Sequence, residues 1–255
     1  MELNLKLNDK QYLSIEQSLK GFEKQMPSIM LNGLTQIAYT VRYDEKKEMQ
    51  RVFDRPTPFT LNSLVIFKAT KQKPEATVAL RDPAGIAFSD ILKKHYLVPQ
   101  IYGGSRALKK FEKRVISSGY FKPNSFLMPG QGVKMNKYGN VNKGDIQKIL
   151  SGLKAQFDPQ RNQKGKGKAR KRRLKNRNNE YFAVGNQTKS SRLAPGVYER
   201  YRFAAGTSIK PVFMIGRKPR YKKLFRFFEV AEDSITKNWK REMEDAVERA
   251  VRTAR

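Results

Sequence analysis

Residues 15–41, IEQSLKGFEKQMPSIMLNGLTQIAYTV, decide the fold class of this 255-residue chain. Apolar or small residues recur there at steps of three and four, the spacing of one face of an amphipathic helix. That face comprises Ile15, Leu19, Phe22, Met26, Ile29, Gly33, Ile37 and Val41, widened by Tyr12, Met30 and Leu34. Because Pro27 removes a backbone donor and clashes with the preceding turn, we expect a kink or break near Met26. The helix can continue past Tyr43 with an exposed charged face.

A second long helix is predicted at the other end, over residues 224–254. Its apolar stripe comprises Phe228, Ala231, Ile235, Trp239, Met243, Ala246, Val247 and Ala250. Between the two helices lie five β-rich runs, at 61–70, 76–81, 181–184, 197–204 and 209–215. The first two flank the polar turn KQKPE and are predicted to form a hairpin. We expect the terminal helices to pack on one antiparallel sheet made from these runs, which is an α+β fold.

This topology predicts a single elaborated domain over residues 1–255, with its core in 1–83 and 180–255. Residues 84–160 form an insertion, and a basic arm follows at 161–179. Within the insertion we expect short helices near 89–96, 106–118 and 145–157, and an irregular loop over 121–141, which is rich in Gly, Pro and Asn. The inward faces of the last two helices comprise Leu108, Phe111, Val115, Ile146, Ile149, Leu150 and Leu153.

The basic arm is centred on residues 161–177, RNQKGKGKARKRRLKNR, which contain no acid. Its cations are Arg161, Lys164, Lys166, Lys168, Arg170, Lys171, Arg172, Arg173, Lys175 and Arg177. With so few apolar residues the arm has nothing to bury, so we expect it to order only beside a polyanion. The formal charge of the whole chain is +30, which indicates nucleic acid as a partner. The alternatives are a solvated loop or contact with an acidic protein.

A weaker basic cluster follows the arm. It comprises Arg200, Arg202, Arg217, Lys218, Arg220, Lys222 and Lys223. Strand alternation predicts that Arg200 and Arg202 share one face of a strand with Tyr198. A continuous basic patch across the cluster is one possible arrangement.

The residues for catalysis are missing from the sequence. His95 is the one histidine and there is no cysteine, so we predict no catalytic residues, no metal site and no cofactor. Asp44 and Glu45 beside Lys46 and Lys47 resemble a nuclease set superficially, but a solvated helix face explains them better. The glycines at 103–104 and 130–132 lack the Lys-Ser/Thr ending of a phosphate-binding loop.

The start, MELNLKLNDK, is not a signal peptide, and no apolar run is long enough to span a membrane.

Several stretches resemble minor tail and neck proteins of tailed bacteriophages, specifically the lambda minor tail protein Z group. They are MQRVFDRPTPFTLNSL (49–64), HYLVPQIYGG (95–104), RALKKFEKRV (106–115), YGNVNKGDI (138–146) and PVFMI (211–215). The resemblance covers most of the chain, although none of these motifs is a chemical signature.

The resemblance implies a non-enzymatic structural protein of the virion neck or tail, assembled in the host cytoplasm. Its expected partners are copies of itself in a ring around the DNA channel, neighbouring neck, tail or portal-side proteins, and DNA bound without sequence preference. The alternative is an RNA-binding or ribosome-associated basic protein, which an aromatic pair on a strand face at RNA-recognition spacing would favour, but the sequence shows no convincing pair. A DNA enzyme is the third and least favoured hypothesis.

Overall fold

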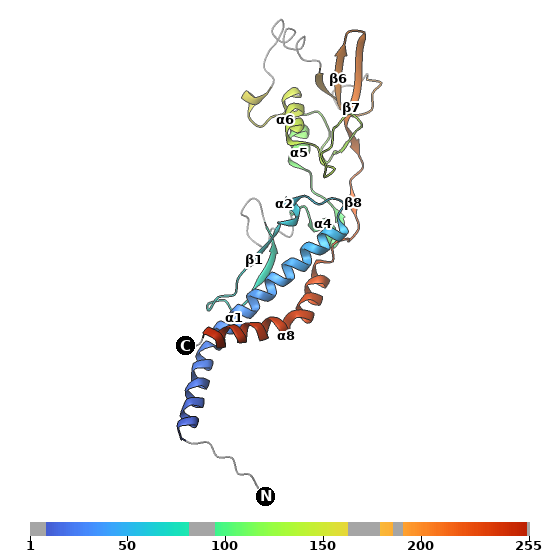
Figure 1. Cartoon of the computed structure of the whole chain (residues 1–255). Coiled ribbons are helices and arrows are strands. Elements are labelled where there is room, and N and C mark those ends of the chain that lie inside the picture. Colours follow the sequence, from blue (N-terminus) through green and yellow to red (C-terminus); the bar gives the residue numbers. More distant parts are fainter. Residues whose placement is uncertain (1–8, 82–94, 163–178, 186–190, 254–255) are drawn as a thin grey trace. The chain divides into compact units, whose positions relative to one another are not determined.

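The computed structural model describes residues 9–81, 95–162, 179–185 and 191–253, and the fold is α+β as predicted. The chain divides into two compact units. The helical unit comprises residues 1–95 and 224–255, and the sheet unit comprises residues 96–223 (Figure 1). Residues 180–223 therefore group with the residues that precede them, whereas the sequence interpretation assigned them to a core shared with 1–83.

The helical unit is built on two long helices that lie side by side, α1 (Asp9–Val52) and α8 (Phe227–Thr253). A single turn, α2 (Pro58–Leu61), follows α1 and is capped by the Thr57 side chain. The predicted hairpin is confirmed as β1 (Leu64–Phe67) and β2 (Thr77–Leu80), paired antiparallel. Both strands contact α1. Leu64, Ala79 and Leu80 of the hairpin are buried, whereas Phe67 is 57% exposed.

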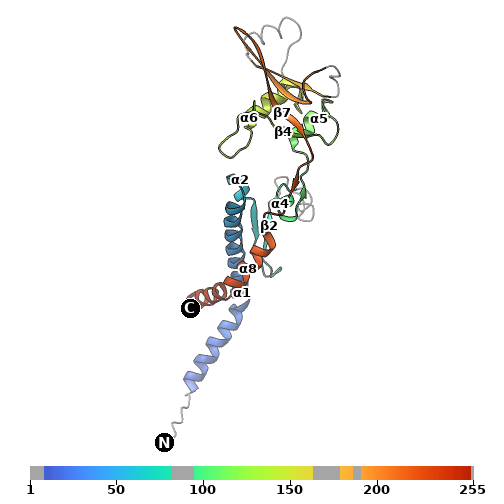
Figure 2. The same cartoon turned by 90° about the vertical axis from the view of Figure 1, so that its right-hand side faces the viewer.

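The predicted apolar stripe of α1 is confirmed from Ile29 to Val41, where Ile29, Ile37 and Val41 are buried. Gly33 belongs to the stripe because a Cβ there would collide with the thioether of Met243 on α8. Met26 and Met30 were wrongly assigned to this face, since they are 38% and 50% exposed. The side chains of residues 9–22 lie outside the described part. Of the predicted kink or break near Met26, the break is not found, because α1 runs through Pro27 as one helix; the helix bends along its length (Figures 1 and 2).

The buried face of α8 differs from the predicted one. Phe228, Ile235 and Trp239 are exposed, Trp239 by 45%. Of the predicted stripe Ala246 is buried, and the other buried positions are Ser234, Asn238 and Glu242, which lie at steps of four with it. The Ser234 hydroxyl donates to Asp44 Oδ2 at 2.7 Å, and the Thr40 hydroxyl donates to Glu242 Oε1 at 3.0 Å. Hydrogen bonds therefore set the rotation of α8 against α1.

The sheet unit opens with α4 (Val98–Tyr102) and β3 (Gly104–Ser105), which pairs with β8 (Arg220–Tyr221). Two helices follow, α5 (Lys110–Ser117) and α6 (Lys143–Gly152), and then the 3-10 turn η1 (Pro159–Arg161). The main strands are β4 (Phe126–Pro129), β5 (Asn179–Val184), β6 (Gly196–Phe203) and β7 (Gly206–Gly216). These four form an antiparallel sheet in the order β4–β7–β6–β5.

The core of the sheet unit lies between the two helices and this sheet. Its buried members are Phe111, Val115, Phe121, Leu127, Ile149, Leu150, Leu153, Ala155, Val197, Val212 and Phe213. The predicted inward faces of the helices at 106–118 and 145–157 are confirmed at Phe111, Val115, Ile149, Leu150 and Leu153. A strand, β4, interrupts the stretch predicted to be irregular.

One sheet made from all five β-rich runs is not found, because β1 and β2 form a two-stranded sheet of their own. A sheet buries one face against another layer of structure. The sequence offers two sets of helices for that purpose, and the two sets of strands pack on different helices. The hairpin packs on α1, and β4–β7 pack on α5 and α6.

Candidate nucleic-acid interface

Positive charge is concentrated in the sheet unit. Residues 96–223 contain 31 Lys and Arg residues and five acids, a net charge of +26. The remaining residues contain 22 Lys and Arg and 18 acids, a net charge of +4. A positive charge this large attracts polyanions and repels other basic surfaces. The sheet unit is therefore the candidate nucleic-acid interface.

Both ends of the basic arm are attached to this unit. Its first residue, Arg161, closes η1, where Asp158 Oδ1 accepts from the Gln160 N–H at 2.9 Å. The Ser151 hydroxyl at the end of α6 donates to the Arg161 carbonyl at 3.0 Å. After the arm the chain is described again from Asn179, which pairs with Tyr201 on β6. The two ends of the arm are thus held on α6 and β6.

Of the ten predicted contact residues, the structure describes only Arg161, whose side chain is exposed and lies 3.5 Å from the Asp158 carboxylate. The other nine lie outside the described residues: Lys164, Lys166, Lys168, Arg170, Lys171, Arg172, Arg173, Lys175 and Arg177.

The face of the sheet away from the helices carries a cluster of aromatic and charged side chains. The rings of Phe182 and Tyr198 stack with centroids 5.7 Å apart, and the Arg200 guanidinium lies 4.9 Å from the Phe182 centroid. The Glu180 carboxylate lies 3.5 Å from Arg200 and 3.6 Å from Arg202. The predicted common face for both arginines is therefore supported. Because one carboxylate serves two guanidinium groups, this corner keeps a net positive charge.

Tyr198 itself is not available to a ligand. Its side chain is buried, its hydroxyl donates to the Ala194 carbonyl at 2.7 Å, and burial raises its pKa. The Phe182–Tyr198 stack is thus part of the packing of the sheet. The stack contacts the Arg200 guanidinium through the Phe182 ring, and it does not offer a surface on which a base could stack.

The rest of the second basic cluster lies at the opposite end of β7. Arg217, Lys218, Arg220, Lys222 and Lys223 are exposed on the segment that leads from β7 through β8. Arg200 pairs with Ile209, near the start of β7, and Arg217 follows its last residue. At about 3.3 Å per residue, these eight positions span roughly 25 Å. The cluster therefore forms two separate groups of cations.

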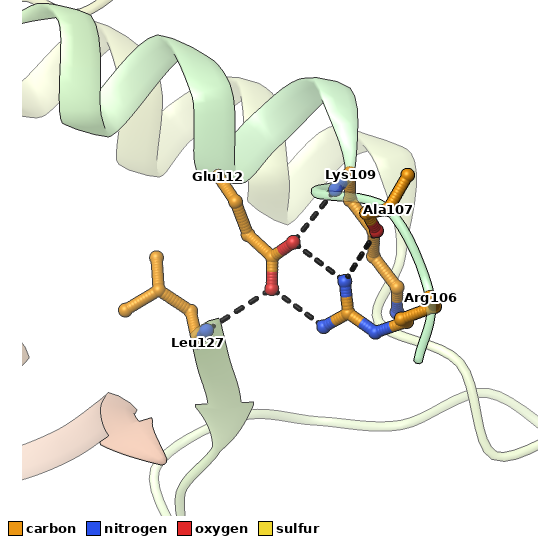
Figure 3. A network of polar contacts seen from close by, with 5 residues as sticks. All are labelled: Arg106, Ala107, Lys109, Glu112 and Leu127. Atoms are coloured by element: carbon orange, nitrogen blue, oxygen red, sulfur yellow. Dashed lines mark hydrogen bonds and ion pairs between the residues drawn. The ribbon is translucent and has the colours of Figure 1, made fainter. Parts of the chain in front are cut away.

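A buried ion pair fixes the start of α5 to the sheet (Figure 3). Both oxygens of Glu112 bind the Arg106 guanidinium, at 2.6 and 2.7 Å. The same carboxylate accepts the backbone N–H of Lys109 at 2.6 Å and that of Leu127, on β4, at 3.0 Å. Burial alone raises the pKa of Glu112, but these donors outweigh it and the pKa lies below its ordinary value. The Arg106 guanidinium therefore has a structural role and is not a candidate for binding nucleic acid.

Sequence reasoning missed this network, although a signal for it exists. Glu112 is the third residue of α5, and its bond back to the Lys109 N–H is half of a capping box. It also lies next to Phe111, on the side of the helix that faces the sheet.

The acidic stretch of α1 is not a solvated face, contrary to the sequence interpretation. Glu45 is 0% exposed, and neither carboxylate oxygen has a hydrogen-bond partner in the described part of the chain. Desolvation, followed by the nearby carboxylates of Glu48, Asp44 and Glu229, raises the pKa of Glu45 to about 9. Glu48 is different, because Arg51 binds it at 2.6 and 2.7 Å and its pKa is lowered.

The spacing of apolar residues along the sequence could have predicted that Glu45 is buried. It continues the steps of four that join Ile37 and Val41 to Met49, all of which are buried. Neutral at ordinary pH and enclosed, Glu45 is no candidate for a nuclease site.

The glycine pairs of the sheet unit have structural roles. Gly103 and Gly104 adopt φ values of 80° and 97°, which turn the chain from α4 into β3. Gly130 and Gly132 lie against β7, where their N–H groups donate to the carbonyls of Val212 and Pro211 at 2.8 Å. A Cβ on Gly130 would lie 2.5 Å from the Pro211 oxygen. Neither pair cradles a phosphate.

Within the described ranges, no group of three or more His, Asp or Glu residues is arranged to hold a metal ion. Among the same residues, no helix has the length and apolar content to span a bilayer. Comparison with protein-family models, with curated proteins and with solved structures finds no match to this chain.

Proposed function

We propose that this chain is a structural protein of the head–tail junction of a tailed phage, which contacts DNA phosphates through its sheet unit and basic arm. The observation that carries the proposal is the charge division, +26 on the sheet unit against +4 on the rest. Lys and Arg bind phosphates by releasing condensed counterions, and this attraction is independent of sequence. The sequence resemblance to the lambda minor tail protein Z group supplies the phage context.

The proposal includes copies of the chain arranged in a ring around DNA, beside other neck, tail or portal-side proteins in the virion. It assigns no catalytic residue, metal or cofactor. The exposed apolar side chains of Phe228, Ile235 and Trp239 on α8 support a contact between copies, because they belong to the nearly neutral helical unit.

Salt-dependent DNA binding tests the proposal. If about six cations of the arm meet phosphates at once, the binding constant falls with a log–log salt slope of about −5. Replacing Arg170, Lys171, Arg172 and Arg173 with Gln should flatten this slope by about three to four units. All duplex sequences should weaken alike, since backbone contacts carry no base information.

A matched control removes four cations from the helical unit, Lys68, Lys71, Lys237 and Lys240, again to Gln. This variant should keep the parental slope, measured by fluorescence anisotropy on one 20-bp duplex at several salt concentrations. If instead both variants change the slope equally, net charge and not the arm controls binding. If the arm variant keeps the parental slope, the arm contacts an acidic protein and the DNA assignment is overturned.

One observation favours the alternative of an RNA-binding protein. The rings of Tyr201 and Phe203 are exposed on β6, and exposed aromatic side chains commonly bind unpaired bases of RNA by stacking. A duplex DNA and a single-stranded RNA of equal charge, titrated in parallel, separate the two functions. Tighter binding of the RNA would favour the alternative.

A further inference from the structure

As far as the structure describes the strands, the far end of the β6–β7 hairpin extends beyond the others of its sheet. Among the described residues, β5 pairs with β6 from Gly196 to Tyr201, and β4 pairs with β7 from Phe213 to Gly216. Arg202 and Phe203 pair with β7, opposite Thr207 and Gly206. This two-stranded ribbon is visible at the top of the sheet unit in Figure 1. Its side chains face solvent with no helix over them in the described structure.

Two aromatic rings occupy one face of this ribbon. Tyr201 and Phe203 stand two residues apart, so they point to the same side of β6. That side is the one that carries Val197 into the core and pairs Glu199 with Lys210. Beyond the helices it becomes surface, and Tyr201 is 37% and Phe203 50% exposed. The face that forms the core at one end of β6 is thus an exposed aromatic surface at the other.

The two rings lie together and form one aromatic surface. Their centroids are 6.3 Å apart with an interplanar angle of 27°, a stacked arrangement. Both rings keep exposed area, so a base can stack on the solvent side of the pair. In contrast, the Phe182–Tyr198 stack contains a buried Tyr198.

Cations surround the aromatic pair. Lys210 is exposed and shares the aromatic face, because it pairs directly with Glu199. Arg200 and Arg202 lie on the opposite face of the same thin ribbon and share one carboxylate, Glu180. Single-stranded nucleic acid is bound by this combination of stacking rings and nearby positive charge. An acidic protein would need the cations but not the rings.

We propose that the Tyr201–Phe203 pair stacks on an unpaired base, so that the ribbon end is a binding site for single-stranded nucleic acid. The proposal rests on the nucleic-acid contact of the proposed function and adds bases to the phosphates. Lys210, on the same face as the rings, binds the backbone beside the stacked base, and the arginines of the opposite face add positive charge to the ribbon. Duplex DNA, whose bases are already stacked, gains nothing from the rings.

Three fluorescent probes of equal length test the proposal on the full-length protein: oligo-dT of 20 nucleotides, the same chain made abasic, and a 20-bp duplex. The parent should bind oligo-dT more tightly than the abasic chain. Alanine at a base-stacking aromatic weakens binding by about 5- to 150-fold per base. The double variant Tyr201→Ala/Phe203→Ala should therefore bind oligo-dT at least tenfold more weakly, with little change for the abasic chain and the duplex.

Controls keep the result specific to the pair. Phe157→Ala removes an aromatic ring that is 88% exposed in the same unit, and it should leave all three affinities unchanged. Tyr201→Phe keeps the ring and should keep the preference for oligo-dT. Lys210→Gln should weaken all three probes alike.

The proposal is overturned if the parent binds oligo-dT and the abasic chain equally, or if the double variant, folded by circular dichroism, keeps the parental affinity for oligo-dT. In both of these cases phosphate-driven binding survives and the proposed function stands. Binding of none of the three probes by the parent would overturn both.

Discussion

Glu45 makes the stability of the helical unit depend on pH in a direction opposite to that of most carboxylates. Its pKa is about 9 in the folded chain, where the carboxyl is fully buried, and about 4.5 when exposed. Between these values the folded chain binds a proton that the unfolded chain has lost. The contribution of Glu45 is therefore complete below pH 4.5 and falls as pH rises towards 9.

The size of this effect follows from the linkage of one proton. Each pH unit within the window costs about 1.4 kcal/mol, so the free energy of unfolding falls by roughly 4 kcal/mol between pH 5.5 and 8.5 from this group alone. The charged groups that face Glu45 add to its effect in one direction, since Asp44 and Glu48 from α1 and Glu229 from α8 all raise its pKa. The lowered pKa of Glu48 acts only below pH 4.5 and does not oppose the slope in this window.

The substitution Glu45→Gln tests the argument, because an amide of the same shape carries no charge at any pH. We expect the variant to match the parent near pH 5 and to exceed its stability by up to about 4 kcal/mol at pH 8.5. Trp239, on α8, is the one tryptophan of the chain, so its fluorescence follows the unfolding of this unit in denaturant. Titrations at four pH values and constant ionic strength give the slope.

Glu244→Gln is the matched control, since it removes an exposed carboxylate from α8. It should keep the parental slope. Parallel stability–pH lines for the parent and Glu45→Gln would refute the reasoning, because they would mean that Glu45 is not neutral and enclosed in the folded chain.

Two further substitutions test the packing of the units. Glu112→Gln should destabilise the sheet unit by about 3–5 kcal/mol in denaturant unfolding followed by circular dichroism, because it leaves the buried Arg106 charge without its carboxylate; replacing both residues with Met should recover much of that loss. Trp239→Ala should lower the stability by about 2 kcal/mol, seen as a shift in the melting temperature, because the residue is 45% exposed and keeps about half of its surface buried; a loss of about 5 kcal/mol would restore the buried stripe that the sequence predicts.

The sequence predicts the kinds of elements well, because both long helices and the main strands have strong apolar periodicity. It fails at the rotation of α8. Two stripes at steps of three and four compete on that helix, an apolar one through Ile235 and Trp239 and a small and polar one through Ser234 and Asn238. Hydrophobicity favours the first, but the neighbouring face of α1 offers Asp44 and Thr40 as hydrogen-bond partners. The chemistry of the partner decides the rotation, and one helix alone does not reveal it.

The candidate interface also contains some residues that the sequence predicts and others that it does not. The charge of the arm and the common face of Arg200 and Arg202 follow from composition and strand alternation alone. The exposed pair Tyr201 and Phe203 does not, because alternation assigns the two rings to the face that is core at Val197. Only the packing of the helices and the exposure of Tyr201 and Phe203 show that this face is surface at the far end of the hairpin. A local pattern fixes which residues share a face, and tertiary structure fixes whether that face is covered.

Under the proposed function, the unequal charge of the two units also affects how copies of the chain would contact one another. Copies that met through their sheet units would bring charges of +26 together, and salt at physiological strength screens such repulsion only beyond about 8 Å. Contact through the helical units, at +4 each, avoids this repulsion and uses the exposed side chains of Phe228, Ile235 and Trp239. Association of copies should therefore depend weakly on salt, whereas DNA binding depends on it steeply. The same chain can then join its copies through one unit while the other keeps its full charge for the polyanion.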